Sequence, residues 1–326
     1  MAIEMNKFRK IAFALVATAG IGMMGYGVIA STQGSTLAKA GKHLSSTDKY
    51  IVSTVINTPL GSSSYLEVNT PSASYTEVPY NDGTNNAYVL FDWLTSDNKL
   101  YEVNAYATEE NADKLWLSMP DNLGVELSGR KTMYAELLSK GLYDCKENGE
   151  QDLNLGKAST SKVKMYKGKL KSETVKELFK KDSYSLYSEL KEQCRVENDK
   201  DSMNKVSDYM NQLDRNLTFS DAEFEFGIYD DDLVYWSLTT GGLGSSMRVT
   251  KQLIVTEFQL RETPDFSKVT DTYFDANKSK ILQAIDNAEN GNLPQPTQQP
   301  VEGSITGTEA GSDTKVESTD TSSISD

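Results

Sequence analysis

Short segments with alternating apolar and polar residues follow one another in the first third of the chain. Residues 50–56 are rich in β-branched and aromatic side chains, which favour strands. Residues 100–107 place apolar side chains at every second position, the period of a strand. Residues 88–94 are apolar on both sides and predict a strand covered on both faces. With residues 65–68 and 75–78 between them, these segments predict an antiparallel meander.

Helical spacing replaces this alternation in the middle of the chain. Apolar residues form a helical stripe over residues 133–138, Ser172 begins a further helix, and Asp182 begins another. Residues 203–217 carry apolar side chains at spacings of three and four, which predicts an amphipathic helix. Residues 162–166 between them predict a strand.

The last third returns to strands at residues 224–228, 233–238 and 248–260, and a helix follows from about Pro264. Strands, helices and strands in this order predict an α+β fold in which a curved antiparallel sheet, similar to a half-barrel, is covered by inserted helices.

The first forty residues predict export. Lys7, Arg9 and Lys10 precede an uncharged run that begins at Ile11 and ends at Ala30. Positive charges before such a run stay in the cytosol, so the rest of the chain is predicted to lie outside it. The run is long enough to span a bilayer, and small residues before Ser31 and at Ala38 and Ala40 fit signal-peptide cleavage. Residues 1–40 are therefore predicted to be a signal peptide or a membrane anchor.

Composition changes again at Gly291, after which Pro, Gln, Ser, Thr and acidic residues dominate and aromatic residues are absent. Such a segment buries too little apolar surface to fold. We expect residues 41–290 to form an extracytoplasmic α+β domain and residues 291–326 to be a disordered tail. The net charge of −14 argues against nucleic acid as a partner.

The two cysteines, Cys145 and Cys194, leave two alternatives open. In an exported protein such a pair favours a disulfide, which would add about 3 to 4 kcal/mol to stability. The other alternative is two buried free thiols.

Catalytic and metal-binding patterns are weak. The single histidine, His43, falls in the predicted linker after the leader, where it would be a poor catalytic base. Ser128 and Lys131 match a Ser-x-x-Lys pattern without the accompanying Lys-Thr-Gly element. The acidic run at residues 230–232 could bind calcium, although a hairpin turn explains it better. We therefore predict a protein that is not an enzyme, with no metal and no cofactor.

Aromatic side chains are the best candidates for ligand contacts. On a curved sheet beneath helices they could line an apolar cavity, and the alternative is ordinary core packing. The candidate ligand-binding residues are Tyr88, Phe91, Trp93, Tyr101 and Trp236.

Three segments carry a resemblance to a known family: the turn at residues 80–83 leading into residues 88–94, the strand at residues 163–168, and the paired segments 224–229 and 233–238. In order and turn placement they resemble the LolA/LppX-like half-barrel proteins of bacterial envelopes. The resemblance implies that a lipid or acyl chain lies in the concave face of the sheet. Many members are lipid-modified at a cysteine that this chain lacks.

Two functions follow as expectations. The first is an exported or membrane-anchored binding protein that holds a lipid or other hydrophobic ligand between sheet and helices. The second is a cell-surface module that binds a protein or a glycan. If the leader is not cleaved, residues 11–30 would hold the domain at the membrane.

Overall fold

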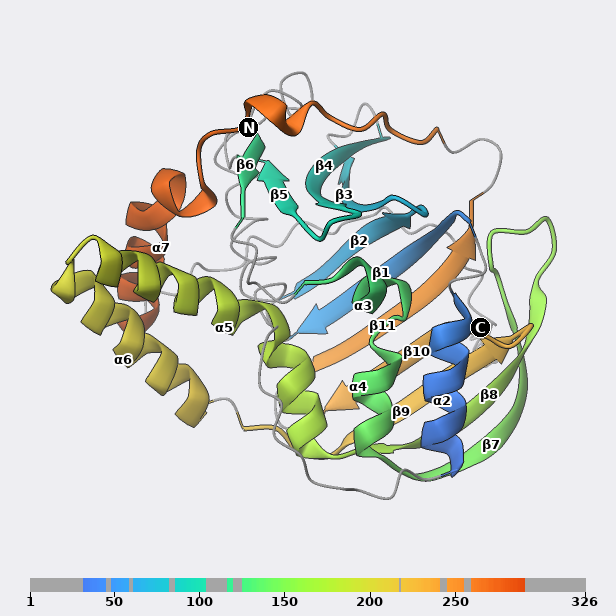
Figure 1. Ribbon diagram of the computed structural model, residues 1–326. Coiled ribbons are helices and arrows are strands. Elements are labelled where there is room, and N and C mark those ends of the chain that lie inside the picture. The colour runs from blue at the N-terminus through green and yellow to red at the C-terminus, as the bar shows by residue number, and fades with distance from the viewer. Residues whose placement is uncertain are drawn as a thin grey trace, which may run out of the picture.

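The computed structural model describes residues 32–44, 48–58, 61–81, 86–103, 116–119, 125–216, 218–240, 245–254 and 259–290. The described strands form one open antiparallel sheet of 11 strands in the order β6-β5-β4-β3-β2-β1-β11-β10-β9-β8-β7. The sheet curves strongly, and helices lie against one of its sides (Figure 1). The predicted α+β class and curved antiparallel sheet are confirmed.

The amino-terminal part of the sheet is the predicted meander. Its strands are β1 (Tyr50–Thr58), β2 (Gly61–Asn69), β3 (Ala73–Asn81), β4 (Asn86–Thr95), β5 (Leu100–Val103) and β6 (Trp116–Ser118). The carboxy-terminal part consists of β7 (Leu142–Leu153), β8 (Ser161–Leu170), β9 (Ala222–Tyr229), β10 (Asp232–Thr240) and β11 (Ser245–Leu253). Because β1 pairs with both β2 and β11, the two parts form one continuous sheet.

The helices are α2 (Thr32–His43), α3 (Leu127–Lys131), α4 (Ala135–Gly141), α5 (Ser172–Val196), α6 (Lys200–Asn216) and α7 (Tyr273–Glu289), with a short 3₁₀ turn η3 (Phe266–Lys268). In Figure 1, α2 and α4 lie side by side in front of β9 and β10, and α5 leads away from them to α6 and α7. The two helices predicted to begin at Ser172 and Asp182 are one continuous helix, α5. Because Asp182 can continue a helix as well as begin one, its presence alone did not mark a break.

We call the side of the sheet that α2 and α4 cover the inner face, and the other side the outer face. Tyr50, Val52 and Trp236 lie on the inner face, in a cluster with Leu37 of α2 and Leu138 of α4. Ile51 lies on the outer face. Side chains alternate between faces along a strand, and directly paired residues share a face. The register therefore assigns every paired residue to one side.

Helix α2 is part of the folded core. Leu37 and Leu44 are fully buried in the inner-face cluster, and Ala40 is nearly so. The boundary expected between leader and domain at residue 40 falls inside this helix. Cleavage after Ala40 would separate Leu37 from Leu44. Residues 32–44 therefore do not form the flexible linker that the position of His43 suggested.

Strand β7 was not predicted, because its sequence carries long polar runs and few apolar positions. It is an edge strand, paired with β8 alone among the described strands. Charged and polar side chains are common on edge strands, where they discourage pairing with other chains.

No helix among the described residues is long and apolar enough to span a membrane. The predicted apolar segment, residues 11–30, and the predicted tail, residues 291–326, lie outside the described residues.

Candidate functional site

The predicted ligand-binding residues do not line one cavity. Trp93 pairs with Tyr75 and Tyr101, so these three residues share the outer face. Trp236 is fully buried on the inner face, where its Nε1 donates a hydrogen bond to the carbonyl of Met133 at 3.1 Å. The register thus places Trp93 and Tyr101 on the outer face and Trp236 on the inner face. This assignment could not be made from the sequence, because it depends on how the strands pair.

The other two predicted residues lie in β4. Phe91 is half-buried. Tyr88 pairs with Pro79, and its side chain is outside what the structure describes.

A row of polar side chains crosses the inner face at the strands of the meander. The register aligns Val52 with Glu67, Glu67 with Thr76, and Thr76 with Asp92. The next row contains Asn69 and Ser74. All of these polar side chains except Glu67 are at least nine-tenths buried, and Glu67 is 14% exposed. A buried polar patch of this kind requires internal partners.

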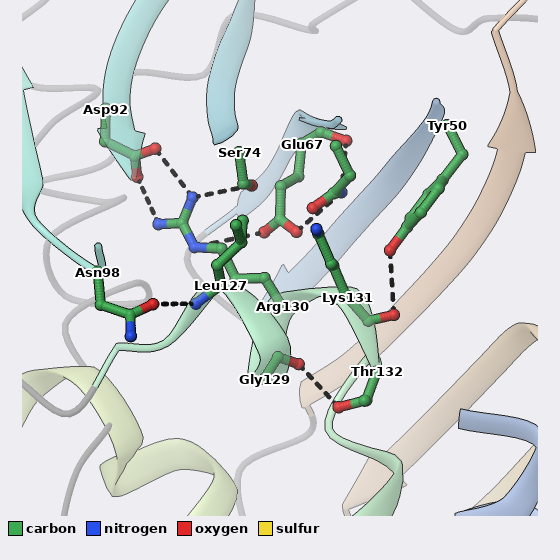
Figure 2. Close-up of polar contacts among 11 residues, drawn as sticks. Tyr50, Glu67, Ser74, Asp92, Asn98, Leu127, Gly129, Arg130, Lys131 and Thr132 are labelled. Carbon is green, nitrogen blue, oxygen red and sulfur yellow. Dashed lines mark hydrogen bonds and ion pairs between the residues drawn. The ribbon is translucent and has the colours of Figure 1, made fainter. Parts of the chain in front are cut away.

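Arg130 of α3 supplies the positive charge for this patch (Figure 2). Its two terminal nitrogens donate to the two oxygens of Asp92 at 3.2 and 3.1 Å. Its Nε lies 3.9 Å from an oxygen of Glu67, and one terminal nitrogen lies 3.4 Å from the hydroxyl of Ser74. Two parallel N–H···O bonds of this kind fix the guanidinium in position. We call Arg130, Glu67, Asp92, Asn69 and Ser74 the arginine cluster.

Helix α3 is held at both ends, which sets the position of Arg130. At its start the backbone N–H of Leu127 donates to the side chain of Asn98 at 3.0 Å. At its end the carbonyl of Lys131 accepts a hydrogen bond from the hydroxyl of Tyr50 at 3.0 Å. Met133 and Tyr134 then take left-handed backbone conformations and turn the chain into α4. Figure 2 shows both anchoring contacts on either side of Arg130.

The arginine cluster contains more negative than positive charge when both carboxyls are ionised. Burial opposes the charge of Arg130, but the carboxylates of Asp92 and Glu67 outweigh it and raise the pKa of Arg130. Burial raises the pKa of Glu67, against the opposing effect of Arg130. The carbonyl oxygen of the Asn69 side chain is buried and has no hydrogen-bond partner among the described residues, although its Nδ2 donates to Glu67 at 3.1 Å.

A second buried charged group lies beside the first, on the other side of Val52. Lys251 pairs with Val52 and forms an ion pair with Asp232. His43, at the end of α2, also contacts Asp232, at 3.0 Å from its Nδ1. Burial lowers the pKa of Lys251, against the opposing effect of Asp232. These contacts join α2 to the sheet, so His43 has a structural partner that its sequence position did not indicate.

Apolar clusters flank the arginine cluster on the inner face. One lies over β1 and β8 to β11 and includes Phe224, Phe226 and Trp236 beneath α2 and α4. The other joins Leu94 and Leu100 of the sheet to α5, α6 and α7. The long helix α5 contributes to both, through residues near its two ends. The arginine cluster therefore lies between two apolar clusters on the inner face.

Sequence reasoning missed Arg130, Glu67, Asp92 and Lys251. In a strand with alternating polarity, charged residues are normally taken as solvent-facing. One signal was available: Asp92 lies among apolar neighbours on both sides in a strand predicted to be buried on both faces. The remaining residues had no local signal, because their burial depends on α3 and on strand pairing.

The cysteines are free thiols, each buried in a different cluster. Cys145 packs in the inner-face cluster with α2 and α4, and Cys194 packs with α6 and α7. The disulfide predicted between them is not formed in this structure. Of the two alternatives, the structure contains the free thiols.

The first two residues of the acidic run at 230–232 form the predicted hairpin turn between β9 and β10, and Asp232 begins β10. Asp230 and Asp231 both have positive φ, as a two-residue hairpin turn of type I′ requires. No group of three or more metal-ligating side chains occurs among the described residues.

No protein family model matches the chain, and no curated protein matches it. Among solved structures, LprF from Mycobacterium bovis matches with a TM-score of 0.36 and 8% identity, covering 71% of this chain and 97% of that one. A DUF1329 family protein from Desulfovibrio piger matches with a TM-score of 0.21 and 8% identity, covering 71% of this chain and 96% of its own. These are weak likenesses in overall arrangement, and neither bears on what this chain binds.

Proposed function

We propose that this chain is a non-enzymatic, extracytoplasmic binding protein that holds an amphiphilic molecule between the inner face of the sheet and its helices. The observation that carries the proposal is the arginine cluster, a buried charged group between two apolar clusters on the helix-covered face. Ligand sites commonly combine apolar walls with a few fixed polar groups. The apolar clusters would take the hydrocarbon part of the ligand, and the polar cluster its headgroup.

The charges of the cluster select the headgroup. Asp92 already pairs with Arg130 through two hydrogen bonds. The remaining acceptors are Glu67 and the side-chain oxygen of Asn69, which has no partner among the described residues. Acceptors are satisfied by hydrogen-bond donors, and an added carboxylate would repel Glu67 when Glu67 is ionised. We therefore expect a headgroup with hydroxyl or amine donors rather than a fatty acid.

The export predicted from residues 1–40 supports a place outside the cytosol for this activity, either secreted or held at the membrane by residues 11–30. An uncleaved apolar segment would keep the domain next to a source of amphiphilic molecules.

The first test is direct analysis of the purified full-length protein. Native mass spectrometry should show a bound mass that organic extraction removes and identifies as an amphiphile. In solution, the neutral dye N-phenyl-1-naphthylamine should become fluorescent on binding. A long-chain alcohol or amine should displace it more effectively than the fatty acid of equal chain length.

Glu67→Gln is the diagnostic variant, because it removes the charge and keeps the shape of the side chain. In this variant the long-chain amine and the fatty acid of equal chain length should displace the dye with more similar effectiveness than in the unmodified protein. Glu147→Gln, at a side chain that is 58% exposed, is the matched control and should leave the difference unchanged. A protein that carries no extra mass and does not bind the dye would contradict the proposal.

A further inference from the structure

Four aromatic side chains gather on the outer face around Phe266, on the side of the sheet away from the arginine cluster. The ring of Tyr101 is stacked on that of Phe266, with centroids 3.9 Å apart and planes 4° apart. The rings of Trp116 and Phe266 meet edge-on, with centroids 5.3 Å apart, and the centroid of the Trp93 ring lies 6.2 Å from that of Phe266. The ring of Tyr75 is stacked on that of Trp93, with centroids 4.6 Å apart. We call Tyr75, Trp93, Tyr101 and Trp116 the aromatic cluster.

The aromatic cluster contains two buried hydrogen-bond donors. The indole Nε1 atoms of Trp93 and Trp116 are buried and have no hydrogen-bond partner among the described residues. The two residues are 2% and 6% exposed. Buried indole N–H groups usually find an acceptor, and leaving one unpaired is unfavourable. Trp236, which donates to a backbone carbonyl, has the usual arrangement.

Phe266 belongs to a segment that crosses the outer face outside any strand. We call residues 259–269 the strap (Figure 1). Arg261 makes two polar contacts between the strap and the sheet: its backbone N–H donates to the hydroxyl of Tyr75 at 3.2 Å, and its Nε lies 2.6 Å from Glu77. Leu260 and Val269 of the strap also pack against the outer-face cluster. Phe266 is only half-buried, and its strap neighbours Asp265, Ser267 and Lys268 are exposed. Phe266 stacks well but offers no acceptor to either indole.

We infer that the aromatic cluster is a glycan-binding site, and that Phe266 occupies in this structure the place of a pyranose ring. Phe266 places one six-membered ring flat against Tyr101, with the two ring planes 4° apart. A pyranose packs its C–H surface against an aromatic face. Its hydroxyl and ring oxygens accept hydrogen bonds, and the indole N–H groups of Trp93 and Trp116 have no acceptor among the described residues.

The strap also determines which groups a bound sugar would meet at the rim. The carboxylate of Glu77 is 3% exposed and is held by Arg261. Displacement of the strap would separate this pair and leave Glu77 free to accept hydrogen bonds from sugar hydroxyls. The sugar binds only molecules in which the strap is displaced. The apparent association constant is therefore the intrinsic constant multiplied by the fraction of molecules with the strap displaced.

The test uses the full-length protein and two probes, the β-1,4-linked hexamers of N-acetylglucosamine and of glucose. Binding is followed by tryptophan fluorescence and by titration calorimetry. At least one hexamer should bind saturably. Phe266→Ala, which empties the ring position, should bind it about tenfold more tightly. Trp116→Phe, which keeps an aromatic ring and removes the N–H donor, should bind about tenfold more weakly.

Phe219→Ala is the matched control. Phe219 is also partly buried and stacked, on Phe179 at 5.1 Å, but it belongs to the inner-face cluster. Its variant should bind the hexamer as the unmodified protein does. The inference is overturned if neither hexamer binds the protein or folded Phe266→Ala, if a polyproline peptide binds there instead, or if Phe219→Ala changes binding as much as Phe266→Ala. Dye displacement at the inner face should not respond to either sugar, so the two proposals fail independently.

Discussion

Arg130 brings a permanent positive charge into the interior of the protein, next to the carboxylates of Asp92 and Glu67. The cluster as a whole is not expected to contribute much net stability, because removing charges from water offsets most of their attraction. Loss of one member is different, since it leaves the opposite charge buried without a partner. At the scale of single residues, Arg130 is therefore the side chain on which the inner face depends.

Arg130→Met should lower the free energy of unfolding by about 3 to 5 kcal/mol, because Asp92 and Glu67 would remain buried and uncompensated. Lys131→Met, at the neighbouring position where the side chain donates to the exposed carbonyl of Pro71, should change the free energy of unfolding by less than about 1 kcal/mol. Urea unfolding measures both. Equal decreases in the free energy of unfolding of the two variants would show that Arg130 contributes no more to stability than Lys131 does.

Glu67 should make stability depend on pH in a defined direction. Burial raises its pKa in the folded protein, so folding favours the protonated form. Its contribution to stability is then fully present below the ordinary pKa of glutamic acid and is lost as the pH rises through the raised value. The free energy of unfolding of the unmodified protein, minus that of Glu67→Gln, should become more negative as the pH rises above the ordinary pKa of glutamic acid. A difference that stays constant would contradict this.

At the scale of elements, α2 and α4 pack against each other and together cover the inner face at β9 and β10. A methyl group built on Gly41 of α2 would lie 2.1 Å from Cβ of Ala135 in α4, so the two helices approach as closely as backbones allow. Small residues are what permit such an approach. Helix α2 therefore packs as an integral part of the domain.

Substitution of two glycines should produce opposite results. Gly41→Ala should lower the free energy of unfolding by about 1 to 3 kcal/mol, because the helices must separate. Gly129→Ala in α3, where the new methyl group meets nothing within 4 Å, should raise it by up to about 1 kcal/mol through helix propensity alone. Thermal or urea unfolding of the pair tests the packing, and a stabilised Gly41→Ala would disprove it.

At the scale of the whole molecule, one sheet carries different chemistry on its two faces. The inner face holds charged groups between apolar clusters, and the outer face holds the aromatic cluster beneath the strap. The two cysteines report on this organisation, because they belong to separate apolar clusters of the inner face.

Both thiols should react slowly in the native protein and completely after unfolding. Burial raises the pKa of Cys145 to about 11 and raises that of Cys194, so little reactive thiolate is present at neutral pH. Mass spectrometry after alkylation should show two labels per chain in denaturant without any reductant, and far fewer under native conditions. Labelling that appears only after reduction would instead indicate the disulfide that the sequence suggested.

The sequence by itself determined most of the local structure. Strand alternation from β1 to β5 and the helical spacing of α6 follow from which side chains each segment must bury, so they can be read locally. The Asp230-Asp231 turn is local in the same way. The polar edge strand β7 and the unbroken α5 were missed because edge exposure and helix continuation depend on neighbouring elements.

Only the tertiary structure decided which residues meet. Alternation divides a strand into two faces but does not tell which strand lies beside it or what covers each face. The register places Trp93 and Trp236 on opposite faces, and it brings Glu67 and Asp92 into one row that α3 supplies with Arg130. Burial of a charged side chain is a property of the assembled fold, because the partner that makes it tolerable comes from a distant part of the chain.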